Sequence, residues 1–223
     1  MSTRELLAFL AGEIARRRIQ HRPLKVAIDG RCAAGKTALA DALAASMGAS
    51  GLQILRPSLD GFHHLQERRY EKGEYSALGY YEDSYDYQAI VDNLLQPLSG
   101  DVYPVLCREI AHDVRTNMAA SAPPVSVCAD AVLLFDGVFL FRRELNVFWD
   151  FRILVDIDAD ASLARALARD TGVIGTNDVV RRKYQLRYEP AWQIYLKREH
   201  PESKADVIVD NRDFLHPRIL QRP

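Results

Sequence analysis

One short segment constrains this chain more than any other, because it matches the phosphate-binding pattern G-x-x-x-x-G-K-[ST] at every fixed position. The glycines of such a loop let the backbone curl so that successive N–H groups point at phosphate oxygens. The helix that follows presents its positive end to the same place. Here an apolar run, Leu24–Ile28, precedes the loop and a helical pattern, Lys36–Met47, follows it. In this pattern Lys36 reaches the β- and γ-phosphates and the Thr37 hydroxyl ligates Mg²⁺. We therefore expect ATP to bind at Gly30, Arg31, Cys32, Ala33, Ala34, Gly35, Lys36 and Thr37.

The elements around this loop alternate between short apolar strands and helical stretches, which predicts a parallel sheet with helices on both faces. A capping box at Ser2–Glu5 opens an amphipathic helix within residues 1–20. Pro57 lies inside the second predicted strand and favours an edge position for it. A length of 223 residues suits one large α/β domain, so we predict a single three-layer domain over residues 1–223. The expected strands are Leu24–Ile28, Gln53–Leu59, Ala131–Phe135, Phe151–Ile157 and Val207–Val209. The other expected elements are helices at Asp86–Gln96, Ala161–Arg169 and Asn177–His200, the last interrupted at Pro190, and an irregular hairpin at Tyr103–Thr116.

Three of the predicted strands end in Asp-Gly, at Asp29, Asp60 and Asp136. In open α/β sheets the site lies at the carboxyl ends of the strands, so these carboxylates could converge on one edge. Asp136 would then hold Mg²⁺ together with Thr37, either directly or through water. For Asp60 an ordinary turn role before Gly61 remains the alternative.

Composition and charge limit the classes of partner. The formal net charge is −1, so there is no global basic field to gather nucleic acid or an anionic membrane. Cys32, Cys107 and Cys128 are widely spaced and form no CxxC, which suggests neither a disulfide framework nor a zinc site and fits a reducing cytoplasm. There is no signal-peptide pattern, and no apolar run approaches the length that crosses a bilayer. We expect a cytoplasmic protein with a small-molecule partner, no nucleic acid and no membrane, and the sequence leaves a homo-oligomer open.

The loop by itself does not separate the classes of P-loop protein. The guanine-reading Asn-Lys-x-Asp motif of GTPases is absent from the chain. Larger ATPase motors need more chain and usually carry a second acidic residue beside the aspartate of the metal site, where this chain has Gly137. These absences favour a kinase.

Several further segments, taken in order, resemble the uridine kinase and phosphoribulokinase group of P-loop kinases, which also includes bacterial pantothenate kinase and sugar kinases. The resemblance covers about Leu24 to Asn211, and the order of the motifs is more specific than any one of them. The segments that carry it are Ser58–His63, Gly79–Asp86, His112–Thr116, Phe135–Phe139, Leu145–Asp170 and Ala205–Val209.

This resemblance implies a three-layer parallel-sheet P-loop NTPase (kinase) fold with a small helical lid at about residues 160–200. It makes Asp60 the catalytic carboxylate, which accepts the proton of the attacking hydroxyl and orients its oxygen. Arg165 and Arg169 match lid arginines and lie one helical turn apart, so they could neutralise charge on the transferring phosphoryl group, with a solvated helix face as the alternative. Candidate acceptor-binding residues are Asp60, Tyr81, Asp83, Asp113 and Arg115.

The chain departs from uridine kinase on the acceptor side. The ribose-binding Phe-Asp-His-Pro segment corresponds to Tyr80-Tyr81-Glu82, and the Tyr-Asp-Phe-x-x-His motif corresponds to His112–Asn117. The Arg-Gly-Arg of the lid corresponds to Val173-Ile174-Gly175. A cluster of tyrosines around Tyr81 could line the acceptor pocket, although ordinary packing explains such a cluster equally well.

These observations predict an ATP- and Mg²⁺-dependent kinase that phosphorylates a hydroxyl of a small metabolite, with a nucleoside as the first expectation. A sugar or pantothenate-type kinase on the same scaffold is the alternative enzyme, and an ATP-binding regulatory module without turnover is the alternative from another class. Cys32 raises one further question, because a helix N-terminus favours the thiolate form of a cysteine while burial opposes it.

Overall fold

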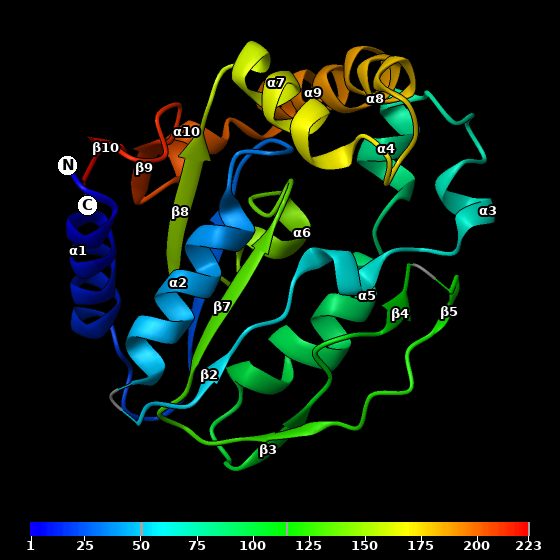
Figure 1. Ribbon diagram of the computed structural model, residues 1–223. Helices are drawn as coiled ribbons and strands as arrows, with labels where there is room; N and C mark the ends of the chain where they lie inside the picture. The colour runs from blue at the N-terminus through cyan, green and yellow to red at the C-terminus, as the bar shows by residue number, and fades with distance from the viewer. Residues whose placement is uncertain (50, 115, 223) are drawn as a thin grey trace.

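The structure, a computed structural model, describes residues 1–49, 51–114 and 116–222, and these residues form one large sheet of six strands in the order β10-β9-β8-β1-β7-β2. Neighbouring strands run parallel, except that β10 runs antiparallel to β9 (Figure 1). The strands of this sheet are β1 (Leu24–Asp29), β2 (Ile54–Leu55), β7 (Val132–Gly137), β8 (Phe151–Asp156), β9 (Val207–Asp210) and β10 (Arg218–Gln221). The prediction of a mostly parallel sheet is confirmed, while β10 was not predicted.

Helices cover both faces of this sheet, which confirms the three-layer α/β architecture. The longer helices are α1 (Thr3–Arg16), α2 (Lys36–Gly48), α4 (Ala77–Asp83), α7 (Ala159–Asp170), α8 (Asn177–Lys183) and α9 (Glu189–Glu199). Short helices are α3 (Gln66–Arg69), α5 (Tyr87–Ile90), α6 (Arg143–Asn146) and α10 (Pro201–Lys204). The 3₁₀ turns are η1 (Leu59–Phe62) and η3 (Pro97–Ser99), and the π-helical turns are η2 (Val91–Leu95) and η4 (Tyr184–Tyr188).

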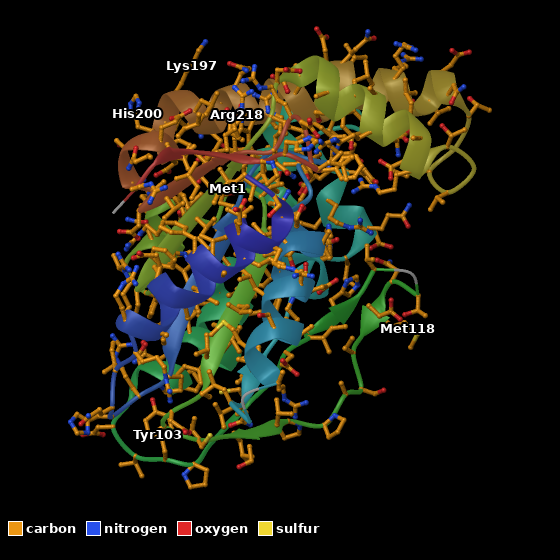
Figure 2. The ribbon with its side chains drawn as sticks, turned by 60° about the vertical axis from the view of Figure 1, so that its left-hand side comes forward. Met1, Tyr103, Met118, Lys197, His200 and Arg218 are labelled. Carbon is orange, nitrogen blue, oxygen red and sulfur yellow. The ribbon has the colours of Figure 1, made fainter. Side chains whose placement is uncertain are left out.

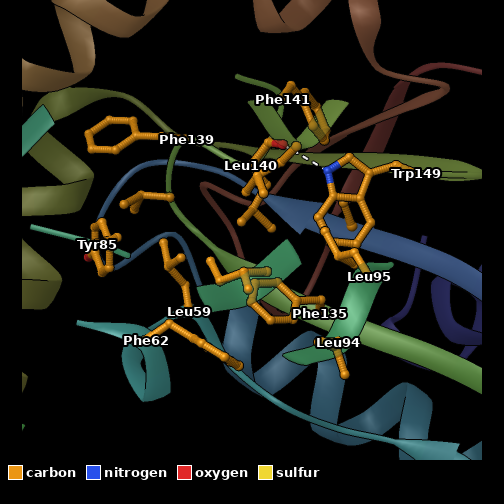
Figure 3. Packing of buried hydrophobic residues seen from close by; sticks show 14 of the residues in the cluster. Leu59, Phe62, Tyr85, Leu94, Leu95, Phe135, Phe139, Leu140, Phe141 and Trp149 are labelled. Atoms are coloured by element: carbon orange, nitrogen blue, oxygen red, sulfur yellow. Dashed lines mark hydrogen bonds between the residues drawn. The ribbon is translucent and has the colours of Figure 1, made fainter. Parts of the chain in front are cut away.

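Alternation along β1 explains how the two faces are built. Val26 and Ile28 belong to the core against α1 and α2, whereas Ala27 belongs to the core on the opposite face. That second core is rich in aromatic rings: Phe135 of β7 packs on Trp149, whose indole N–H donates to the carbonyl oxygen of Leu140 at 2.8 Å (Figure 3). A strand buried on both faces reads as a continuous apolar run, which is why the sequence identified β1, β7 and β8 correctly.

Two predicted elements differ from the structure. The second strand is limited to β2, because Pro57 has no N–H for the ladder, and its edge position is confirmed. The irregular segment forms nested antiparallel pairs, in which β3 (Val105–Cys107) pairs with β6 (Val125–Val127) and β4 (His112–Asp113) pairs with β5 (Met118–Ala119). The partner strands of this hairpin lie beyond the predicted range.

The helices α7, α8 and α9 gather at the end of the molecule toward which the arrows of β7 and β8 point (Figure 1). The helical run from α8 to α9 is continuous and changes to π-type hydrogen bonds in η4, just before Pro190. Pro190 lacks an N–H to donate to the carbonyl four residues earlier, and the π turn accommodates that loss. The predicted interruption is therefore a change of hydrogen bonding rather than a break.

Among the described residues, no helix combines the length and the apolar character needed to cross a membrane.

The first helix begins as predicted, since Ser2 and Glu5 form the capping box. The N-terminus lies beside the C-terminal segment, where the Met1 amino group donates to the carbonyl oxygen of Pro217 at 3.3 Å (Figures 1 and 2).

Candidate active site

The phosphate loop, residues 30–37, connects the end of β1 to the start of α2, as the motif requires. Gly30 and Gly35 have φ angles of 153° and 93°, which side chains with a Cβ rarely adopt. A Cβ at Gly30 would lie 2.3 Å from the carbonyl oxygen of Val155 in β8, so the loop can approach the neighbouring strand only with glycine there. Ala33 also has a positive φ of 58°. The loop is therefore a fixed curl at the N-terminus of α2.

Lys36 is the first residue of α2 and turns back over this loop. Its ammonium donates to the carbonyl oxygen of Arg31 at 2.8 Å, and the residue is only 8% exposed. The Arg31 side chain points elsewhere: it pairs with Glu189 of α9 at 2.8 Å and lies over the ring of Trp192. Any contact of Arg31 with phosphate in this arrangement would come from its backbone N–H, and its side chain connects the loop to α9.

Two oxygen ligands suited to Mg²⁺ meet at the first turn of α2. The hydroxyl of Thr37 donates to Oδ2 of Asp136 at 2.7 Å, and the Asp136 side chain is 3% exposed at the end of β7. Within the described part of the chain, no cluster of three or more His, Cys, Asp or Glu side chains could enclose a metal ion. Mg²⁺ prefers oxygen ligands and usually takes the remainder from substrate phosphates and water, so the pair fits that ion.

A pocket of about 570 Å³ adjoins the phosphate loop. We name it the C-terminal pocket; it is lined by the first turns of α1 and α2, by Arg165 and Arg169 of α7, and by residues 209–217. Leu6, Phe214 and Leu215 make much of its wall apolar. Its volume lies within the range of small-ligand sites, and its position beside Gly35 and Thr37 suits the base and ribose of a nucleotide whose phosphates occupy the loop.

The C-terminal segment is connected to the loop directly, a feature that was not predicted. Asn211, which follows β9, donates through Nδ2 to the carbonyl oxygen of Ala34 at 2.7 Å. Arg165 donates to the carbonyl oxygens of Asn211 at 2.6 Å and Arg212 at 3.0 Å. Arg169 instead pairs with Asp170 at 2.6 Å. Both predicted arginines therefore line the pocket. Of the two, Arg165 is the one that hydrogen-bonds to the C-terminal segment, and the catalytic role of both stays a prediction.

Asp60 lies on η1, directly after the edge strand, and is exposed. Ser58, two residues before it, pairs in parallel with Asp136 at the end of β7, so the turn that carries Asp60 begins at the carboxyl edge of the sheet. The charge of Asp60 also raises the pKa of Cys32 and of Tyr85. The hydroxyl of Tyr80 lies 3.5 Å from the Cys32 sulfur and 3.2 Å from the Tyr85 hydroxyl. His63 lies beside the same residues. Its ring centroid is 4.5 Å from that of Tyr85, and its Nδ1 is 2.9 Å from the carbonyl oxygen of Asp60.

The thiol of Cys32 is not activated. Burial raises its pKa, and the charge of Asp60 raises it further, while Lys36 and the hydrogen bond with Tyr80 oppose the shift less strongly. Burial is the largest of these effects, and it favours the neutral thiol over the thiolate.

The other residues predicted to bind the acceptor are Tyr81, Asp83, Asp113 and Arg115. Tyr81 is 2% exposed; its hydroxyl donates to Glu199 at 3.3 Å, and its ring lies against the Arg142 guanidinium, so the structure gives it a packing role. Asp83 pairs with Lys72 at 2.8 Å. Asp113 lies in β4, and Arg115 is outside the described residues. Substrate contacts of these residues stay predictions. Within the predicted tyrosine cluster, Tyr80 contacts Cys32 of the loop and Tyr85 contacts Tyr80.

Asp29, the last residue of β1, holds the loop to α9 rather than joining the metal site. One carboxylate oxygen accepts the Gly30 N–H at 2.7 Å and the other accepts the Tyr195 hydroxyl, which itself accepts the Phe141 N–H at 3.0 Å. Burial raises the pKa of Asp29 from its usual 3.8 to about 6, although the hydrogen bond from Tyr195 lowers it. Asp29 therefore lies on the same carboxyl edge as Asp136, as predicted, since it pairs with Gly137 of β7, but its side chain is engaged by Tyr195 of α9.

Replacing Tyr195 by phenylalanine should lower the free energy of unfolding by about 1–3 kcal/mol, because it removes a donor from a buried carboxyl group. The raised pKa means that the stability contributed by Asp29 is full below about pH 4 and is lost as the pH rises through about 6. Without the Tyr195 donor this pKa rises further, so the loss in the variant should be larger at pH 8 than at pH 5. Urea unfolding at pH 5 and at pH 8 measures the free energy of unfolding of the wild type and of the variant. Tyr103→Phe, at a half-exposed tyrosine, is the control, and an equal loss at both pH values would contradict this account.

Comparisons with known proteins agree with this fold. Residues 26–213 match the family described as "Phosphoribulokinase / Uridine kinase family". Uridine kinase of Deinococcus deserti is 25% identical over 200 residues, covering 89% of this chain and 92% of that protein. Uridine-cytidine kinase A of Dictyostelium discoideum is 26% identical over 191 residues, covering 84% of this chain but 36% of that protein. The chain spans only about a third of the length of this relative and of two other eukaryotic ones.

Solved structures share the fold at low identity. A structure described as a possible uridine kinase from Bacillus stearothermophilus has a TM-score of 0.72 and 23% identity, covering 92% of this chain and 97% of that one. D-glycerate 3-kinase from Cryptococcus neoformans has a TM-score of 0.60 and 14% identity, covering 96% and 99%. The match over residues 26–213 includes both the phosphate loop and the segment around Asp60, so this chain belongs to the phosphoribulokinase and uridine kinase family of P-loop kinases.

Proposed function

We propose that the protein is a kinase that transfers the γ-phosphate of ATP to a hydroxyl of a small metabolite, with a nucleoside as the acceptor, and that it acts in the cytoplasm. The observation that carries the proposal is the position of Asp60. Its carboxylate is exposed on a turn that begins beside the end of β7, since Ser58 pairs with Asp136. It lies on a different segment from Thr37 and Asp136, the two residues that would hold Mg²⁺. A carboxylate near a phosphate cradle suits the activation of an attacking hydroxyl.

The chain's own residues would divide the work as follows. The backbone N–H groups of the phosphate loop and the Lys36 ammonium hold the phosphates and offset their charge. Thr37 and Asp136 would hold Mg²⁺, which when bound would neutralise negative charge on the phosphates. Asp60 accepts the proton of the acceptor hydroxyl and keeps its oxygen directed at the γ-phosphorus. Arg165 fixes the segment that lines the C-terminal pocket, where we place the base and ribose of ATP.

The names of the relatives support a nucleoside acceptor, since several are uridine or uridine-cytidine kinases. Among the residues that the structure describes, we identify no contact that favours one nucleoside over another. His112 and Asn117 stand where the resemblance has its base-facing tyrosine and histidine, so the choice among nucleosides would be made by other contacts.

A panel of acceptors with coupled detection of ADP tests this proposal. Nucleosides, pentoses, hexoses and pantothenate are compared at equal concentration, and a nucleoside should give the highest kcat/KM. A preference for a sugar or pantothenate would overturn the acceptor class and leave the kinase. If ATP binds but no acceptor raises ADP release above the rate without acceptor, the kinase itself is wrong and a regulatory ATP-binding module takes its place.

A further inference from the structure

The guanidinium of Arg56, which the proposed reaction does not use, lies beside Thr37 and Asp136, the two residues proposed to hold Mg²⁺. Arg56 immediately follows β2, and its backbone N–H donates to Glu109 at 3.1 Å. Its Nη1 donates to Oδ1 of Asp136 at 2.7 Å, and its Nη2 donates to the carbonyl oxygen of Thr37 at 3.2 Å. One side chain therefore contacts both residues that we assign to Mg²⁺.

These contacts occupy the whole carboxylate of Asp136. Oδ2 accepts from the Thr37 hydroxyl and Oδ1 accepts from Arg56. The pair is well shielded from water, with side-chain exposures of 18% for Arg56 and 3% for Asp136. Arg56 also donates to the carbonyl oxygen of Pro57 at 3.1 Å. A second carboxylate, that of Asp41 at 2.8 Å, is 61% exposed and interacts with Arg56 through water-screened charges. The strong interaction of Arg56 is therefore the one with Asp136.

A cation in this position opposes a second cation at the same carboxylate. A divalent ion that approached the protein alone would meet the charge of Arg56 at close range, with two protein oxygens to offer as ligands. An ion that arrives with a nucleotide brings phosphate oxygens as further ligands and their negative charge as compensation. The arrangement therefore disfavours the binding of a divalent ion to the nucleotide-free protein and permits its binding together with a nucleotide.

We propose that Arg56 is a positioning residue that supplies the counter-charge of Asp136 in the nucleotide-free protein, so that the divalent ion enters together with the nucleotide. This inference rests on the proposed role of Thr37 and Asp136. It adds a residue that controls when that pair becomes available to a metal.

The test measures Mn²⁺ binding to the nucleotide-free protein by electron paramagnetic resonance, which requires no acceptor and no turnover. Arg56→Gln removes the charge but keeps a donor for Asp136, and it should bind Mn²⁺ at least about tenfold more tightly than the wild type, the effect of a modest change in charge interaction. Arg56→Lys keeps the charge and should stay close to the wild type. Since coupling is reciprocal, Mg²⁺ should strengthen ADP binding about tenfold less in Arg56→Gln than in the wild type.

Controls identify the site of the added ion. Arg108→Gln changes an exposed arginine on another segment and should leave Mn²⁺ binding unchanged. Adding Asp136→Asn to Arg56→Gln should abolish the gain, and a gain that survives would overturn the inference. Equal Mn²⁺ affinity in Arg56→Gln and the wild type, or an equal gain in Arg56→Lys, would also overturn it.

The wild type provides a test that does not depend on how the variants fold. Saturating ADP should raise its Mn²⁺ affinity by about tenfold or more, and equal affinity with and without ADP would overturn the inference. The proposed function fails separately: if Asp136→Asn alone leaves the Mg²⁺ dependence of ADP binding intact, the metal pair itself is wrong.

Discussion

Replacing Lys36 by alanine should lower kcat by about 10³-fold or more and weaken ATP binding, comparable to removing one fixed donor from a charge-stabilising site. Lys36 is the cation that the phosphate loop itself provides, and its ammonium lies over the loop, 2.8 Å from the carbonyl oxygen of Arg31. Alanine favours the helix, so α2 should still begin correctly. The measurement is kcat with the best acceptor from the panel, together with the ATP affinity from calorimetry and the melting temperature.

Two further variants make the result specific. Lys197→Ala removes an exposed lysine on the outside of α9 and should change neither rate nor stability (Figure 2). Lys36→Arg keeps the charge but replaces a compact ammonium with a planar guanidinium, and it should lose most of the activity as well. A kcat at the wild-type level in a folded Lys36→Ala protein would refute the assignment of the phosphate loop.

The phosphate loop could be predicted in detail because its physics is local. The positive φ angles at Gly30 and Gly35 and the start of α2 at Lys36 all follow from eight consecutive residues. Asp136 could be placed because a continuous apolar run identifies β7 and the aspartate ends it. In both cases a pattern within one segment determines the position, and the parallel sheet brings the strand ends to one edge.

The remainder of the site depends on contacts between distant segments, for which the sequence has no local signal. Asn211 contacts Ala34 across 177 positions, and Arg56 contacts Asp136 across 80. An asparagine after a short strand and an arginine before a proline give no sign of such contacts when taken alone. The one available signal for Asn211 was its place two residues after the last predicted strand, at the carboxyl edge of the sheet.

The tyrosine cluster shows a second limit. Tyr80 and Tyr81 are adjacent on α4, so their side chains project about 100° apart, and only the packing decides which one faces the loop. The structure directs Tyr80 to Cys32 and Tyr81 to Glu199. The same uncertainty applied to Asp29, which reads like Asp60 and Asp136 in the sequence but is fully buried under α9.

Replacing Asp60 by asparagine should lower kcat by roughly 10²-fold or more while ATP affinity changes little, because a general base commonly contributes 10²–10⁴-fold. Asparagine keeps the size of the side chain and removes the proton acceptor and the negative charge. The local fold should tolerate the change: Asp60 is exposed, and the cap of η1 is made by the Ser58 hydroxyl with the Asp60 backbone N–H. The measurements are kcat, ATP affinity, Mg²⁺ dependence and melting temperature on one preparation.

These four measurements separate three roles of Asp60. A general base gives a low kcat that added Mg²⁺ does not restore. A metal ligand gives a variant that needs more Mg²⁺ and recovers activity as the concentration is raised. A turn residue gives a kcat and a melting temperature near those of the wild type, since asparagine serves as well before Gly61. Asp101→Asn, an exposed aspartate beside Tyr103 and far from the phosphate loop, is the matched control for loss of one surface charge (Figure 2). Unchanged kcat in Asp60→Asn would remove the catalytic role. Another residue beside the phosphate loop would then have to accept the proton of the acceptor hydroxyl. His63, whose Nδ1 contacts the carbonyl oxygen of Asp60, is a titratable group on the same segment.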